Sequence, residues 1–283
     1  MSFPCRSGMV SLVALALLLT QSTLHPARGE ASSASSKKTS GANCDREQFR
    51  VIIDVGHSAE VPGALSARGV PEYEFNLQLA KNIERKLRDA GFSKTVLLIT
   101  PGKALIGLVK RATYATHSPA DLFLSIHHDA VPDSFLEKWE YEGKKNHFSD
   151  RFSGHSIFVS QDNSEFKASL LFGKLLGNQL KNLGLKYTPH YIEKFMGRRQ
   201  RQLVDAEAGV YRYDQLVVLR STQMPAVLLE AGSIVNREEE LLLATPEHQT
   251  HIGSAVANAV ESFCLAQSLR KPEQRIARRP PAP

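Results

Sequence analysis

Three apolar stretches of the chain each end on a residue that can bind a metal ion or move a proton. VIIDVGH ends at His57, DLFLSIH ends at His127 and PAVLLE ends at Glu230, while Glu72 lies just before a predicted helix. Two neutral imidazoles and one carboxylate are a common ligand set for catalytic zinc, which keeps a fourth position open for water. Zinc held in this way lowers the pKa of its water to about 7 and makes hydroxide available at neutral pH. These residue types therefore indicate metal-dependent hydrolysis.

Glu230 is the candidate for a second carboxylate that works beside the metal. It follows Ala226 and Leu228 on the same face of an apolar strand, which is an unusual place for a solvated acid. A carboxylate in that position can take the proton of the attacking water and later deliver it to a leaving amine.

The same residues also admit simpler interpretations. A histidine at the end of a strand is often an ordinary loop residue. His127 and His128 are adjacent, so in an extended strand they point to opposite faces, and at most one is expected to reach the metal. Glu72 and Glu74 could serve only as negative charge at a helix N-terminus, which the helix macrodipole favours.

Strand-like apolar runs alternate along the chain with segments of helical periodicity. This alternation, with strands that are apolar throughout, predicts a single α/β domain. We expect a twisted, mostly parallel six-stranded sheet with helices on both faces. Strands are predicted at 49–54, 95–100, 121–127, 155–160, 215–220 and 225–232, and helices at 75–91, 105–115 and 169–184.

The predicted elements bring the candidate residues to one place. Open parallel sheets carry their sites at the carboxyl ends of the strands, so His57, His127 and Glu230 are expected to meet at one sheet edge. Near the C-terminus, Asn236 is expected to cap the helix REEELLLA, with Glu239 as its capping-box partner.

Two long polar stretches, 131–154 and 186–213, do not fit the alternation. Connections of more than about 12–15 residues without their own structure are usually functional or disordered. Both stretches are expected to be lids or partner surfaces, and a plain surface insertion is the alternative.

The beginning of the chain has the pattern of a secretory signal peptide. Arg6 precedes the apolar run 9–20, and Ala27-Arg28-Gly29, with small residues at its first and third positions, provides a cleavage site. The apolar run is too short for a comfortable membrane span, so no span is expected in the mature chain. We therefore predict a signal peptide at 1–29 and a periplasmic or secreted protein.

Composition sets the remaining boundaries. Residues 30–43 are rich in Ser, Ala and Lys and predict a flexible leader, and 266–283 predict a disordered basic, Pro-rich tail. The folded domain is then 44–265, and it is expected to be a monomer.

Cleavage after residue 29 changes both the cysteine count and the charge. Cys44 and Cys264 remain, either as a disulfide, which an oxidising compartment permits, or as two free thiols. The formal charge falls from +6 to +4, because Arg6 and Arg28 leave and residues 1–29 contain no acid. A mild basic excess suits an acidic polymer such as cell-wall material. Export argues against nucleic acid as the partner.

Four segments, in order, resemble the zinc-dependent N-acetylmuramoyl-L-alanine amidases, a family of bacterial cell-wall hydrolases with a twisted six-stranded α/β domain. The resemblance covers 51–263, and four motifs at suitable separations are specific where one would be weak. The segments are IIDVGH, GALSARGVPEYEFNLQLA, LFLSIHHDA and LVVLRSTQMPAVLLEAGSIVNREEE.

Carried over by position, the resemblance implies the roles of the site residues. It makes His57, Glu72 and His127 the zinc ligands and Glu230 the catalytic acid and base, and it prefers His127 over His128 because the ligand directly follows Ser-Ile. Arg220 and Asp129 are candidates for substrate contacts. For Arg220, which occupies a recurrent arginine position, the alternatives are to orient Glu230 or to have a plain surface role. The chain departs from the family pattern at Ser58-Ala59, where Gly-Gly is usual, at Asp129, where Asn is usual, and at Ser233, where Phe is common.

The resulting prediction is an exported zinc amidase that cleaves the bond between the lactyl group of N-acetylmuramic acid and the L-alanine of the stem peptide. Peptidoglycan is the expected partner, and an activator protein is a further candidate. The alternatives are a zinc peptidase that acts within stem or other exported peptides, and a wall-binding regulator without turnover. Because some family members are kept inactive by an inserted segment, Glu137, Glu140 and Glu142 in SFLEKWEYEGKKNHFSD are candidate blocking carboxylates.

Overall fold

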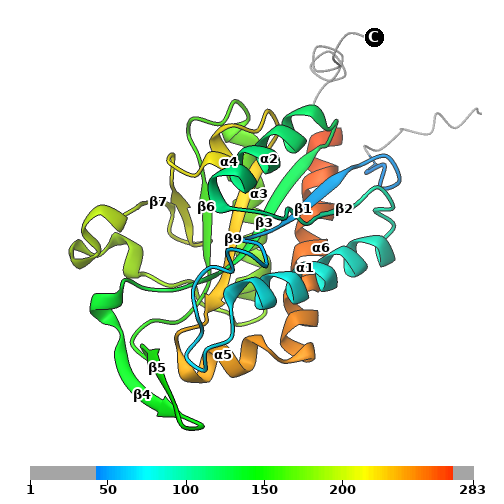
Figure 1. Ribbon diagram of the computed structural model, residues 1–283. Coiled ribbons are helices and arrows are strands. Elements are labelled where there is room, and N and C mark those ends of the chain that lie inside the picture. The colour runs from blue at the N-terminus through cyan, green and yellow to red at the C-terminus, as the bar shows by residue number, and fades with distance from the viewer. Residues whose placement is uncertain (1–42, 270–283) are drawn as a thin grey trace, which may run out of the picture. The chain divides into compact units, whose positions relative to one another are not determined.

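The computed structural model describes residues 43–269, which form an α/β domain around one mixed sheet (Figure 1). The predicted signal peptide, all but the last residue of the predicted leader, and residues 270–283 of the predicted tail lie outside the described residues. The sheet has seven strands in the order β2-β1-β3-β9-β6-β8-β7. Their bounds are β1 Val51–Val55, β2 Val96–Leu98, β3 Leu122–Asp129, β6 Ser156–Val159, β7 Gln202–Asp205, β8 Val210–Arg212 and β9 Ala226–Ser233.

The centre of the sheet is parallel, as the sequence predicts. β1 pairs in parallel with β2 and β3, and β3 pairs in parallel with β9. β6 then runs antiparallel to β9, β8 runs parallel to β6, and β7 closes the edge antiparallel to β8. Four of the six pairings are thus parallel. The predicted fold class is confirmed, with one strand more than expected.

The strand predicted at 215–220 is wrong. This segment forms the short helix α4, Val217–Arg220, which buries Val218 and Leu219 and exposes Arg220. The buried Asn163 side chain donates to the carbonyl of Leu219 and to two further carbonyls just downstream, which fixes the chain in a turn. A run of four apolar residues does not distinguish a strand from one helical turn. The two extra strands, β7 and β8, come instead from the stretch 186–213.

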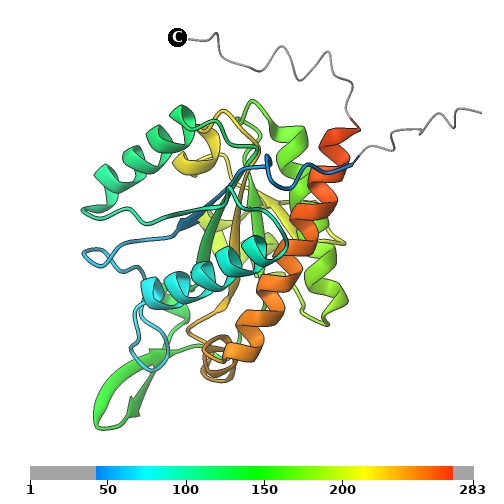
Figure 2. The same ribbon diagram turned by 90° about the vertical axis from the view of Figure 1, so that its right-hand side faces the viewer.

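Helices cover both faces of the sheet, and alternate strand residues face each layer (Figures 1 and 2). On one face, Ile53 and Leu124 pack against α1 Glu72–Asp89, α3 Phe166–Asn182 and α6 Pro246–Ser268. On the other face, Ile52 and Phe123 pack with α4 and with α2 Ala104–His117. Since α6 ends at Ser268, the ordered domain continues three residues beyond the predicted boundary at 265.

The stretch 131–154 has structure of its own. After the short 3₁₀ turn η1 Asp133–Phe135, it forms an antiparallel hairpin of β4 Glu137–Tyr141 and β5 Lys144–Phe148, separate from the main sheet (Figure 1). The Trp139 side chain donates to the carbonyl of Ala67 at 2.8 Å. The Arg68 guanidinium lies over the Trp139 and Tyr141 rings. The hairpin is therefore fixed to the loop that precedes α1.

Asn236 caps helix α5, Arg237–Leu243, as predicted, because its side chain accepts from the N–H groups of Glu238 and Glu239. Glu239 does not return the bond expected of a capping box. Its carboxylate accepts instead from the N–H groups of Gly154 and Ser233. It thereby joins the end of the hairpin stretch to the end of β9.

Cys44 and Cys264 form a disulfide, which settles the question that the sequence leaves open. The bond closes a loop between residues separated by 220 positions. It joins the start of the described chain to α6, where Cys264 packs in the main core.

The disulfide should contribute measurably to stability, because it restricts the unfolded chain. The double variant Cys44→Ser/Cys264→Ser is expected to lose about 2–5 kcal/mol in unfolding free energy, measured by denaturant titration. Addition of reductant should bring the native chain to the stability of the variant and leave the variant unchanged. Native protein whose stability is insensitive to complete reduction would contradict this prediction.

Candidate active site

His57 lies at the carboxyl end of β1 in an unusual backbone conformation. Its φ angle is 63°, in the left-handed region that few non-glycine residues adopt. The preceding Gly56 donates its N–H to the carbonyl of Ile126, which joins this turn to β3. A Cβ at position 56 would lie 2.5 Å from the ring of His127. Glycine is therefore required here for the two imidazoles to approach.

A buried ion pair between Arg111 and Asp54 stabilises this turn. The Arg111 guanidinium, on α2, donates to the carbonyl of His57, and its Nε lies 3.2 Å from Oδ1 of Asp54. Ser125 donates to the other oxygen of Asp54 at 2.7 Å. Burial raises the pKa of the Asp54 carboxyl, while the charge of Arg111 opposes that rise. The strained turn at His57 is thus held by a residue that the sequence analysis did not single out.

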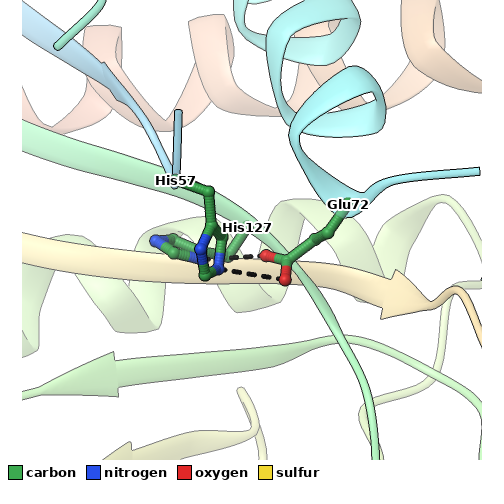
Figure 3. A group of neighbouring side chains, drawn as sticks. All are labelled: His57, Glu72 and His127. Carbon is green, nitrogen blue, oxygen red and sulfur yellow. Dashed lines mark hydrogen bonds and ion pairs between the residues drawn. The ribbon is translucent and has the colours of Figure 1, made fainter. Parts of the chain in front are cut away.

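Glu72, the first residue of α1, joins the two histidines (Figure 3). Its Oε2 lies 3.0 Å from Nε2 of His57, and its Oε1 lies 3.0 Å from Nδ1 of His127. Burial alone would raise the pKa of Glu72, but hydrogen bonds from His127 and His57 hold it well below its usual range. One ligand atom from each residue lies within 4.8 Å of the others. Two nitrogens and one oxygen that converge in this way suit zinc.

His128 lines the same cavity but is not part of this convergent group. Its Nδ1 lies 2.8 Å from the Asn76 Oδ1, and the same Asn76 amide donates to Oε1 of Glu72 at 3.1 Å. Burial lowers the pKa of His128 to about 3, so the imidazole is neutral. His128 therefore supports the helix that carries Glu72, and it does not join the convergent set.

Glu230 lies on β9 directly beside His127, its register partner on β3. Both residues line one cavity of about 310 Å³, together with His57 and Glu72. Burial, with the charges of Asp129 and Glu72 nearby, raises the pKa of Glu230 well above its ordinary value. Its Oε2 is buried and has no hydrogen-bond partner among the described residues. A buried oxygen without a partner beside a metal-capable group suits a carboxylate that exchanges a proton.

Asp129 and Arg220, the two residues that the resemblance suggests for substrate contacts, lie in different places. Asp129 lines the cavity and accepts a hydrogen bond from the hydroxyl of Tyr191 at 2.8 Å. Burial raises the pKa of Asp129 to about 7, against the opposing effect of that hydrogen bond. Arg220 is exposed on α4 and is not among the residues that line the cavity.

A further part of the cavity lining comes from the stretch 186–213. It consists of Tyr191, Arg199, Arg201 and Tyr213. The length and polarity of this stretch indicate a functional segment, but nothing in its sequence shows which side chains face the site. The hairpin behaves differently, because none of its residues lines the cavity. Glu137, Glu140 and Glu142 are exposed on it, so they do not block the site in this structure.

Two known amidases are similar to this chain in sequence. AmiA from Escherichia coli, an N-acetylmuramoyl-L-alanine amidase, is 28% identical over 274 residues, which cover 91% of this chain and 86% of AmiA. AmiC from Neisseria meningitidis is 23% identical over 229 residues, which cover 78% of this chain and 54% of AmiC.

Solved structures show the same fold. The amidase Ami1 from Mycobacterium smegmatis superposes with a TM-score of 0.59 at 18% identity, over 80% of this chain and all of Ami1. The CwlD amidase from Clostridioides difficile, solved in complex with the GerS lipoprotein, gives a TM-score of 0.55 at 19% identity, over 76% of this chain and 98% of CwlD. The family model described as N-acetylmuramoyl-L-alanine amidase matches residues 51–262. The chain therefore belongs to the N-acetylmuramoyl-L-alanine amidase family.

Proposed function

We propose that this chain is an exported zinc-dependent enzyme that hydrolyses the amide bond between the lactyl group of N-acetylmuramic acid and the L-alanine of the stem peptide. One observation carries the proposal: His57, Glu72 and His127 converge in the cavity that also contains Glu230. Membership of the amidase family supports an amide as the bond that is cleaved and the cell wall as the substrate.

The roles of the residues follow from their positions. His57, Glu72 and His127 would hold zinc, which supplies a Lewis acid that activates water at neutral pH. Glu230 accepts the proton of the attacking water and delivers it to the alanine nitrogen as the amide bond breaks. The partly buried position of Glu230, whose Oε2 is buried, favours this role, because a carboxyl with a raised pKa can hold the proton until the nitrogen leaves.

Export is supported by the pattern of the first residues and by the disulfide, since disulfides persist in oxidising compartments. Within 43–269, none of the helices combines the length and apolar character that a membrane span requires. We further propose that a partner protein regulates the enzyme, on the analogy of CwlD, which was solved with a lipoprotein partner.

Product analysis tests the proposal. The mature chain, loaded with zinc, is incubated with purified peptidoglycan, and the products are identified by mass spectrometry. The expected products are glycan with a free lactyl carboxylate and peptides with a free N-terminal alanine. Cleavage within the peptide would favour a zinc peptidase, and zinc binding without any cleavage would favour a regulator.

Zinc binding should require all three proposed ligands. His57→Ala, Glu72→Ala and His127→Ala are each expected to remove most of the bound zinc and the activity together, measured by metal analysis and by peptidoglycan release. His128→Ala is the matched control and should keep the metal, because its imidazole contacts Asn76. An empty site in His128→Ala with a full site in His127→Ala would mean that the assignment of the ligand is wrong.

Glu230→Gln should separate metal binding from turnover. The amide has nearly the shape of the carboxyl but cannot take the proton, so fold and zinc content should persist while the rate falls about 10²–10⁴-fold. Glu238→Gln, which changes an exposed carboxylate on α5, should leave the rate unchanged. Near-normal turnover by zinc-loaded Glu230→Gln would sink the assignment, and loss of zinc would make Glu230 a ligand.

Arg111 is expected to position His57 for metal binding. Arg111→Met removes the bond to the His57 carbonyl and leaves Asp54 buried and unpaired, which should cost about 3–5 kcal/mol in unfolding free energy. Loss of such outer support typically reduces metal affinity about 10–100-fold. Arg111→Met/Asp54→Asn removes both charges, so it should recover stability without recovering zinc affinity, measured by competition with a chelator. If zinc affinity returned together with stability, Arg111 would have a structural role only.

A further inference from the structure

Residues of two different chemistries line the cavity. One set comprises the convergent histidines and Glu72, and the other comprises Tyr191, Arg199, Arg201 and Tyr213. The proposed hydrolysis uses the first set and Glu230. Nothing in that chemistry calls for two guanidinium groups in the same cavity.

Arg201 is held in a fixed orientation with unused donors. Its guanidinium carbon lies 3.6 Å from the centre of the Tyr213 ring, and its Nη1 donates to the carbonyls of Arg198 and Gln200 at 2.9 and 2.8 Å. Its backbone N–H donates to the carbonyl of Tyr191 at 2.7 Å. Its Nε is buried and has no partner among the described residues. The planar guanidinium of Arg201 is therefore fixed in place, while its Nε–H donor has no acceptor among the described residues.

Arg199 also makes no ion pair among the described residues. Its side chain is exposed at the cavity, and the ion pairs of residues 43–269 include neither Arg199 nor Arg201. The charge of Arg199 opposes the burial that raises the pKa of Asp129, but the two side chains form no ion pair. The segment that carries both arginines is anchored by buried Met196 and by the bond from Tyr191 to Asp129, so the two cations keep a defined place beside the site.

The arginines line the cavity in which the leaving peptide would begin. In the proposed reaction, Glu230 meets the departing alanine nitrogen, and Arg199 and Arg201 line the same cavity as Glu230. Tyr191 lines it too, and its hydroxyl donates to Asp129 at 2.8 Å. A peptide that begins at the nitrogen beside Glu230 therefore starts in a space that two guanidinium groups line.

We propose that Arg199 and Arg201 form an anion subsite that binds a carboxylate of the peptide portion of the substrate. This inference rests on the proposed function. The lactyl carboxylate is consumed in the scissile amide, so the muramoyl side presents no carboxylate of its own at that bond, whereas an acidic stem peptide retains free carboxylates. A planar guanidinium matches a carboxylate with paired hydrogen bonds, which an uncharged amide cannot replace.

The test uses one disaccharide–tripeptide in three forms: all carboxylates free, the second peptide residue amidated, and the third peptide residue amidated. kcat/KM is measured for the zinc-loaded native chain, for Arg199→Gln/Arg201→Gln, and for the control Arg198→Gln, whose side chain is exposed and does not line the cavity. Circular dichroism and metal content confirm that each variant is folded and loaded.

Amidation of the contacted carboxylate should lower kcat/KM of the native chain about 10- to 100-fold, the range for hydrogen bonds to charged groups. The residue whose amidation has this effect identifies the source of the carboxylate. The double variant should cleave all three forms at the same reduced rate, and Arg198→Gln should behave as the native chain. Equal cleavage of the three forms by the native chain, or a preference that persists in the double variant, would overturn the subsite.

A failure of the proposed function would look different, because the native chain would not cleave even the free form at the lactyl–alanine bond. The subsite is then tested by calorimetric titration of the free tripeptide, unmodified and amidated, into the native chain and the double variant. Tighter binding of the unmodified peptide by the native chain alone supports the subsite, and equal binding of all peptides overturns it.

Discussion

The carboxylate of Glu72, held between two imidazoles, is the interaction on which the arrangement of the site depends. Each of its oxygens lies 3.0 Å from one histidine, and the carboxyl is almost fully buried. Burying a carboxylate is costly unless partners surround it, so both imidazoles and the Asn76 amide must reach one point. The parallel register meets this requirement, because Val55 of β1 lies beside Ile126 of β3, and the histidines follow two residues and one residue later. The first turn of α1 then completes the group.

A cluster of carboxyl groups that includes Glu72 determines the electrostatics of the cavity. Glu72, Asp129 and Glu230 share a space of about 310 Å³, and the pKa values of Asp129 and Glu230 rise through burial. A divalent cation among the ligands would favour the ionised forms of all three carboxylates. The region that binds the metal and the region that moves the proton are therefore electrostatically dependent on each other.

Much of this domain could be predicted from the sequence. β1, β3 and β9 are buried on both faces and appear as continuous apolar runs, so their place and direction are predictable, and so is the meeting of their carboxyl ends. β7 and β8 could not be predicted, because both are very short and each carries a charged residue, Asp205 in β7 and Arg212 in β8. The apolar segment at 217–220 was misassigned because its helical turn is stabilised by the distant Asn163.

The residues of the site also divide into those that could be predicted from the sequence and those that could not. His57, Glu72, His127 and Glu230 stand at ends of recognisable elements, so their types and positions indicate chemistry. Arg111 and Arg201 occupy a helix and a loop with nothing local to mark them, and only the folded chain brings them to the site. Their importance depends on partners 54 and 10 positions away, His57 and Tyr191.

Gly56 has a consequence for how this sequence can change. The face of the His127 ring fills the space where any side chain at position 56 would begin. Position 56 follows β1 and His127 lies on β3, yet neither is free to vary alone: a larger residue at 56 must displace the imidazole, and while the imidazole stays, only glycine is tolerated. The residues that position 56 tolerates are thus determined by the His127 ring, which comes from β3, and not by the motif around His57 alone.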